Sequence, residues 1–298
     1  MSLDHLVQKS AELGLDGLQL ADARHLDSLE YGYISELRRK ADALGLYLEL
    51  GTAGTNPDHL QSIVRAAHVL GTPVMRTFVG EPRGTSGDEM RRVIAQAAAQ
   101  LAQVVPVCER YGVSLALENH QDLTVDELLS LLELLDSAWV GVCFDTGNPL
   151  ALLEDPLESA QAFGPLIKSV HLKDYQIVAT RDGFRLVGCA LGDGCIDLPA
   201  ILDVLKTTGE TARLSIETYI GSHDMPVLTD DYLQRLPETP ARALGRTLRL
   251  VRDRGLSDAP EDMLESLEEG ELLAREDEQV VRSVRWARRA LDTPKAKG

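Results

Sequence analysis

The stretch VSLALEN, residues 113–119, is a short apolar run that ends on a carboxylate, Glu118. A continuous apolar run of this length is typical of a β-strand buried on both faces, as in a parallel sheet. Three later stretches repeat the pattern and end on a possible metal ligand: VGVCFDT (140–146, Asp145), IKSVHLK (167–173, His171) and RLSIETY (213–219, Glu217). Because parallel barrels gather functional residues at the carboxyl ends of their strands, we expect these four side chains to meet.

Helical and strand-like segments alternate from residue 2 to residue 219. Three earlier apolar runs predict further strands: LDGLQLAD (15–22), LYLELGT (46–52) and PVMRTFV (73–79). Amphipathic segments separate all seven runs, and strands joined by helical crossovers lie parallel. The series predicts an α/β fold, a (β/α)8 TIM barrel that lacks its first strand, because the first helical segment begins almost at Met1. A doubly wound sheet is disfavoured, since the chain has no GxGxxG or GxxxxGK loop.

The last part of the chain changes character. An acidic stretch is followed by a basic one, with apolar residues at roughly helical intervals. We therefore predict a TIM-barrel catalytic domain over residues 1–255 and a C-terminal helical extension over residues 256–298. Packing of this extension on its own subunit, and packing on a second copy in a homo-oligomer, both stay open.

Composition limits the classes of function. The 298 residues are 44% hydrophobic, enough for one large core. The formal net charge of −17 would repel a phosphate backbone, which argues against nucleic acid and favours a small-molecule partner. The N-terminus has no signal-peptide-like apolar segment, and no apolar run reaches about 18 residues, so we expect a cytoplasmic protein with no membrane partner.

The four strand-end residues combine three carboxylates with one imidazole. This donor set suits Mn²⁺, Co²⁺, Mg²⁺ or Zn²⁺ with positions left for substrate oxygens. We predict one divalent metal ion held by the four residues already named: Glu118, Asp145, His171 and Glu217. Such an ion polarises a carbonyl and stabilises an enediolate. Glu118 and Glu217 are then the candidates for removing and returning the substrate proton.

Polar residues near the predicted metal site are candidates for substrate binding. His120 lies two residues beyond Glu118, on the same side of the strand if the chain stays extended, with a loop-capping role as the alternative. Lys173 ends the strand of His171, and Arg185 lies in a segment whose sequence predicts a hairpin over the barrel mouth. Lys173 and Arg185 are predicted anion contacts, with solvated surface charges as the alternative.

Several motifs resemble the xylose-isomerase-like TIM barrel superfamily of sugar phosphate isomerases and epimerases. They are LALENH (115–120), VGVCFDTGNPL (140–150), EDPLES (154–159), SVHLKDY (169–175), LGDGCIDLPAIL (191–202) and LSIET (214–218). The similarity runs from about Leu15 to Tyr219. It implies one divalent metal held by a Glu, Asp, His, Glu set, which falls on the four predicted ligands, and two glutamates that exchange the substrate proton.

Two positions depart from the ketose 3-epimerases of this superfamily. Asn148 stands where those enzymes have a substrate-binding His, and Ile177 stands where they have an Arg. Asn148 is therefore the predicted substrate contact at its position. The DTGN and EDPL motifs, with Lys173 two residues after the metal His, resemble a branch of metal-dependent decarboxylases of 3-oxo sugar acids. The apurinic endonuclease branch needs further histidines that this chain lacks.

The sequence thus predicts a metal-dependent enzyme, with manganese among the candidate ions, that acts on a sugar or sugar acid in carbohydrate metabolism. An isomerase or epimerase of a polyhydroxylated carbonyl compound is the first hypothesis. A decarboxylase (lyase) of a 3-oxo sugar acid is the second. A catalytically inactive barrel that binds a sugar is the third.

Overall fold

The computed structural model describes residues 3–84, 86–207, 212–236, 239, 241–256 and 268–292. The chain forms two compact units. The first comprises residues 1–144, 165–170 and 210–215, and the second comprises residues 145–164, 171–209 and 216–298.

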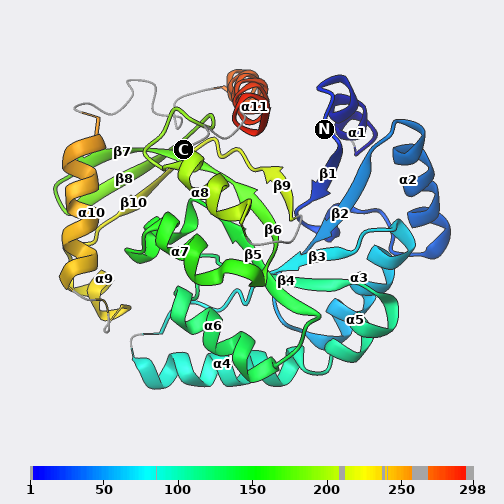
Figure 1. The fold of residues 1–298 in the computed structure, drawn as a ribbon, viewed down its shortest axis with the longest axis horizontal. Helices are drawn as coiled ribbons and strands as arrows, with labels where there is room; N and C mark the ends of the chain where they lie inside the picture. The colour runs from blue at the N-terminus through cyan, green and yellow to red at the C-terminus, as the bar shows by residue number, and fades with distance from the viewer. Residues whose placement is uncertain are drawn as a thin grey trace. The chain divides into compact units, whose positions relative to one another are not determined.

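A seven-stranded sheet in the order β1-β2-β3-β4-β5-β6-β9 belongs to the first unit, except for the last residues of β5, β6 and β9, which are counted with the second (Figure 1). The strands are β1 Gly17–Leu20, β2 Tyr47–Gly51, β3 Val74–Thr77, β4 Ser114–Glu118, β5 Val140–Asp145, β6 Ile167–Leu172 and β9 Arg213–Ile216. From β1 to β5 all neighbours pair in parallel. The seven predicted strands are confirmed as a parallel, nearly closed barrel. The loss of a strand before β1 stays a prediction.

Side chains inside this sheet link its first strands to its last. Glu49 on β2 accepts a hydrogen bond from Gln19 Nε2 of β1 at 3.2 Å and one from Arg213 Nη1 of β9 at 2.8 Å. The Arg213 guanidinium also lies 3.8 Å from the ring centroid of Tyr47. Because Glu49 is buried, its charge needs these donors, and the network keeps β9 beside β1 and β2.

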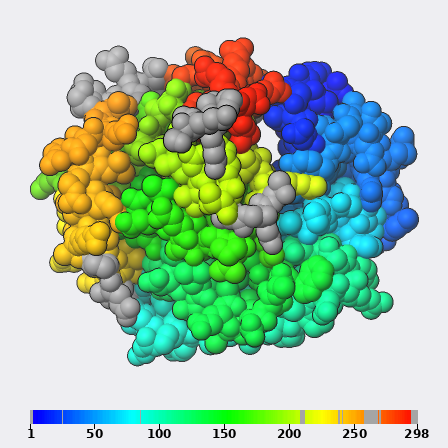
Figure 2. Space-filling model, in the orientation of Figure 1, coloured from blue at the N-terminus to red at the C-terminus, as the bar shows by residue number. Residues whose placement is uncertain are grey.

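Helices of the first unit follow its strands in turn. They are α1 Leu3–Glu12, the 3-10 turn η1 Ala23–His25, α2 Tyr31–Ala43, α3 Pro57–Leu70, α4 Gly87–Leu101, α5 Val105–Tyr111 and α6 Val125–Leu135. Local signals set their ends: Asn56 caps α3, which stops at the left-handed Gly71, and Thr124 with Glu127 forms a capping box on α6. The side chains of α4 and α6 form one surface in Figure 2.

The second unit has a three-stranded antiparallel sheet in the order β10-β8-β7. Its elements are η2 Asn148–Leu152, α7 Pro156–Phe163, β7 Asp174–Thr180, β8 Gly183–Cys189, α8 Leu198–Leu205, β10 Ser222–Met225, α9 Asp230–Gln234, α10 Ala241–Arg254 and α11 Glu269–Asp292. The 3-10 turn η3 Gly164–Leu166 begins at the last residue of one segment of this unit, and its other residues belong to the first. The predicted hairpin is confirmed, since β7 pairs with β8 up to Thr180 and Gly183.

The C-terminal helix α11 packs on its own subunit. Gln279 Nε2 donates to the carbonyl of Gly188 at 3.2 Å, and Ser283 Oγ accepts from the N–H of Leu191 at 3.1 Å. Residues 257–267 and 293–298 of the predicted extension lie outside the described residues. The domain boundary at residues 255 and 256 and the homo-oligomer stay predictions.

Candidate metal centre

Three strand ends meet in the second unit. The N–H of Thr146, just after β5, donates to the carbonyl of His171 on β6 at 3.0 Å, and the N–H of Glu217, just after β9, donates to the carbonyl of Leu172 at 3.0 Å. These bonds hold the ends of β5, β6 and β9 level, because parallel strands in register end side by side. Asp145, His171 and Glu217 are thereby brought together as the sequence predicted.

The donor atoms of this trio fit a single cation. Asp145, His171 and Glu217 each offer one ligand atom, and these atoms lie within 4.8 Å of one another. Two ligands at about 2.4 Å from one ion are separated by at most about 4.8 Å. Two carboxylates and an imidazole also match the donors that borderline and hard divalent ions accept. Both the spacing and the chemistry of this cluster are therefore consistent with a divalent metal site.

Lys173 lies within the cluster. Its Nζ is 2.9 Å from Asp145 Oδ2 and 2.8 Å from Glu217 Oε1, while His171 Nδ1 is 2.6 Å from Glu217 Oε2. Asp145, His171 and Lys173 are buried, whereas the Glu217 side chain is 37% exposed. Glu217 thus forms the side of the cluster that solvent reaches.

The carboxylates decide the protonation of this cluster. Burial alone would lower the pKa of Lys173, but Asp145 and Glu217 outweigh it and raise that pKa above its usual value. Burial would likewise raise the pKa of Glu217, but the contacts with His171 and Lys173 hold it well below its usual range. The site therefore contains the Lys173 ammonium beside the ionised carboxylate of Glu217 at neutral pH.

Backbone contacts fix Asp145 and Lys173 in place. Asp145 Oδ1 accepts from the N–H groups of Gly147 and Asn148 at 2.7 and 2.8 Å, which directs Oδ2 toward Lys173. The hydroxyl of Thr146 accepts from the Lys173 N–H at 2.8 Å and donates to the Lys173 carbonyl at 2.7 Å. Asn148 is buried in the turn that follows Asp145, so this predicted substrate residue is placed beside one of the predicted ligands.

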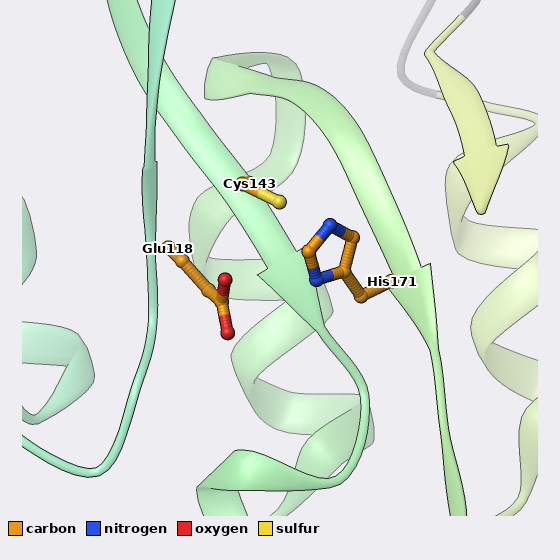
Figure 3. A group of neighbouring side chains, drawn as sticks. All are labelled: Glu118, Cys143 and His171. Carbon is orange, nitrogen blue, oxygen red and sulfur yellow. The ribbon is translucent and has the colours of Figure 1, made fainter. Parts of the chain in front are cut away.

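Glu118 ends β4 in the first unit. Its backbone partner on β5 is Cys143, and Figure 3 shows these two residues together with His171 of β6. Arg76 of β3 donates from Nε to Glu118 Oε2. Both side chains are buried. The sequence analysis missed Arg76, although a single arginine inside the apolar run PVMRTFV was a usable signal.

The remaining predicted substrate residues lie in other surroundings. The His120 ring stacks on Phe78 in the first unit, with centroids 4.3 Å apart. Arg185 of β8 forms an ion pair with Asp224 of β10, its partner in the antiparallel register, at 2.6 Å. Strand β10 therefore already provides a carboxylate for Arg185. Substrate contacts by His120 and Arg185 stay predictions.

Two tyrosines near the trio were missed from the sequence. Tyr175 and Tyr219 follow Lys173 and Glu217 by two residues each, and their ring centroids lie 6.3 Å apart. Tyr219 also stacks on His223 at 4.5 Å. Burial raises the pKa of Tyr175, so its phenol stays protonated. The signal was the alternation of an extended chain, which puts residues two apart on one side.

Comparisons with known proteins place these observations in a wider group. The sequence profile described as "Xylose isomerase-like TIM barrel" matches residues 7–249. The 3-oxo-isoapionate decarboxylase of Pectobacterium atrosepticum is 29% identical over 223 residues, which are 74% of this chain and 78% of that protein.

Solved structures share the fold. A xylose isomerase-like TIM barrel protein from Mycobacterium smegmatis, crystallised in complex with magnesium, gives a TM-score of 0.61 at 17% identity over 82% of this chain and 89% of that one. A D-tagatose 3-epimerase-like protein gives a TM-score of 0.60 at 20% identity, over 85% of this chain and 95% of that one.

Among the described residues, no helix is long and apolar enough to span a membrane.

Proposed function

The chain belongs to the xylose isomerase-like TIM barrel family, and we propose that it is a divalent-metal-dependent enzyme acting on a polyhydroxylated carbonyl compound. The proposed ligands are the four strand-end residues predicted from the sequence: Glu118, Asp145, His171 and Glu217. The trio of the second unit supports this proposal through the spacing and chemistry of its donors.

The register of β4 and β5 supports Glu118 as the fourth ligand. Glu118 pairs with Cys143, and Asp145 lies two residues further along the same strand. Residues two apart on a strand point to the same face. Glu118 and Asp145 therefore belong to one face at the carboxyl end of neighbouring strands, where the site of a parallel barrel is found.

The proposed substrate carries a carboxylate, and Lys173 is the observation that favours it. The proposed ligands Glu118, Asp145 and Glu217 supply three negative charges, and Lys173 and Arg76, which pair with them, supply two positive charges. A divalent cation held by these residues would leave one positive charge in excess. Because uncompensated buried charge is costly, this site favours a substrate with one negative charge over a neutral sugar.

Decarboxylation of a 3-oxo sugar acid fits the charge balance of the site best. The bond between the carboxylate carbon and its neighbour breaks, carbon dioxide leaves, the electron pair stays on the remaining fragment, and one carbon of that fragment takes up a proton. The negative charge of the bound species is the same before and after carbon dioxide leaves. When bound, the ion supplies a Lewis acid for the carbonyl and hydroxyl oxygens.

Two residues of the second unit, Lys173 and Glu217, have proposed roles in this reaction. Lys173 attracts the anionic substrate. Its ammonium also holds a proton, which Glu217, in contact with Lys173 Nζ and partly exposed to solvent, passes to carbon, and Lys173 then regains a proton from solvent. The name of the Pectobacterium relative describes the same reaction class, and the buried position of Lys173 puts this hypothesis ahead of the isomerase that the sequence analysis placed first.

An isomerase or epimerase is the second candidate. The proposed ligands include two glutamates on different strands, Glu118 and Glu217, and such a pair can remove and return a proton on opposite sides of a substrate. This chemistry needs no carbon dioxide to leave and no charge on the substrate.

Isotope exchange distinguishes these candidates. Chelator-treated protein is reloaded with Mn²⁺ and incubated in D₂O with either a 3-oxo sugar acid or a neutral ketose. Release of carbon dioxide with one deuterium bound to carbon supports the decarboxylase. Deuterium in the ketose, with the oxo acid unchanged, would establish the isomerase or epimerase instead. If the metal-loaded protein catalyses neither reaction, the inactive sugar-binding barrel is the hypothesis that remains.

A further inference from the structure

We propose that Arg76 is a positioning residue that holds Glu118 in the orientation needed for metal binding. The inference rests on the proposed function, because it takes Glu118 as one of the ligands. It concerns a residue that acts through Glu118, and it assigns Arg76 no contact with substrate.

The contacts of Arg76 connect three other strands of the first unit. Arg76 lies on β3 and is 7% exposed. Its Nη1 donates to the carbonyl of Ala21, just after β1, at 3.3 Å and to the carbonyl of Thr52, just after β2, at 3.1 Å. Its Nε donates to Glu118 Oε2 at the end of β4. One guanidinium thus joins Glu118 to the ends of β1 and β2.

This arrangement limits the rotation of Glu118. The guanidinium is planar and its donors keep fixed directions, and two backbone carbonyls anchor it independently of the carboxylate. The Arg76 side chain is further held against Phe78, whose ring centroid lies 4.8 Å from Cζ. A carboxylate held by an anchored fork has one favoured orientation. Loss of such supporting contacts typically costs about 10- to 100-fold in metal affinity.

Charge and position predict opposite effects of removing Arg76. A positive charge beside a ligand repels a bound cation, so an arginine that acted only as a charge would weaken metal binding. Its removal would then tighten binding. If Arg76 acts by orienting Glu118, its removal weakens binding, because the carboxylate rotates away. The sign of the change in metal affinity therefore tests the role.

Arg83 provides a matched control within the same unit. Its side chain is 8% exposed, close to the 9% of the Arg76 side chain, with Nη1 at 2.6 Å from Glu127 Oε2 and 2.9 Å from the carbonyl of Asp122. Its partner Glu127 caps helix α6 and is not a proposed ligand. Replacing Arg83 removes the same charge and a comparable set of hydrogen bonds, but leaves Glu118 in place.

The experiment is calorimetric titration of Mn²⁺ into the chelator-treated full chain, with folding checked by circular dichroism. We expect Arg76→Met to weaken binding about 10- to 100-fold, Arg76→Lys to recover part of that loss, and Arg83→Met to keep the wild-type affinity while melting at a lower temperature. If folded Arg76→Met binds Mn²⁺ as tightly as the wild type or more tightly, this inference is overturned but the proposed function is not. If Arg76→Met does not fold, equal affinities of Arg76→Lys and Arg83→Lys would overturn it. Absence of Mn²⁺ binding by the wild type would overturn the proposed function and this inference with it.

Discussion

Lys173 Nζ lies 2.9 Å from Asp145 Oδ2 in the interior of the second unit. An ammonium at this distance from a proposed ligand both neutralises the carboxylate and repels any cation that shares it. The same residue is the main reason for proposing an anionic substrate. Its two effects, on metal and on substrate, can be separated by substitution.

Replacing Lys173 with Met should tighten metal binding and abolish turnover of a 3-oxo sugar acid. Two charges about 4 Å apart interact by about 4 kcal/mol at the effective dielectric constant of a partly buried site. Removal of the ammonium is therefore expected to raise Mn²⁺ affinity by at least about tenfold. Calorimetric titration and an assay of carbon dioxide release measure the two effects.

Lys168→Met is the matched control for this change. Lys168 lies on β6, three residues before His171 and so on the opposite face of the strand. The Lys168→Met substitution removes the same charge from the molecule and should leave both metal affinity and turnover unchanged. Equal effects of the two substitutions would mean that net charge, and not the position of Lys173, controls the site.

Thr146→Val should destabilise the protein and lower its activity. The Thr146 hydroxyl pairs with both the N–H and the carbonyl of Lys173, and valine of similar shape leaves both unsatisfied. Each unsatisfied buried group costs about 1 to 3 kcal/mol. Urea unfolding should show this loss, and Thr146→Ser should recover most of it. An unchanged unfolding free energy in Thr146→Val would contradict the structural role given to this hydroxyl.

Stability should fall in acid through Glu127. Burial favours the neutral carboxyl, but Arg83 and the Thr124 N–H outweigh it and lower the pKa of Glu127 below its usual 4.5. A carboxyl whose pKa is lowered on folding stabilises the protein above its usual pKa, and this contribution disappears as the pH falls through the lowered value. Glu127→Gln should lower the unfolding free energy by about 1 to 3 kcal/mol at neutral pH and by less below about pH 4. Urea unfolding curves of both proteins across this range test the difference, and a gap that widens in acid would have the wrong sign.

The sequence predicted the strand framework and the trio because both depend on short patterns. An apolar run followed by a polar ligand defines a parallel strand and its carboxyl end. Asp145, His171 and Glu217 each occupy such an end, and backbone bonds between neighbouring strands bring them together. The hairpin of β7 and β8 was equally local, since its turn residues and its two arms lie within a few positions of one another.

Contacts between distant strands could not be predicted in this way. Arg76 is 42 residues from Glu118 and Arg213 is 164 residues from Glu49, so neither pair leaves a pattern in a short window. Arg185 was predicted to contact substrate, but its partner Asp224 depends on the pairing of β8 with β10. The burial of Lys173 between two carboxylates depends on three strand ends at once. The position of Lys173 is the reason why decarboxylation is proposed ahead of the isomerisation that the sequence analysis placed first.

The most direct test of the central claim is a titration of Mn²⁺ into chelator-treated wild type and His171→Ala, with His68→Ala as control. His68 lies on α3 and contacts the carbonyl of Tyr111, so it is not a proposed ligand. The account predicts one ion per chain in the wild type and in His68→Ala, and at least about a 100-fold loss of affinity in His171→Ala, since an imidazole ligand and its contact with Glu217 are both removed. Wild-type affinity in His171→Ala, or no ion bound by any of the three proteins, would contradict it.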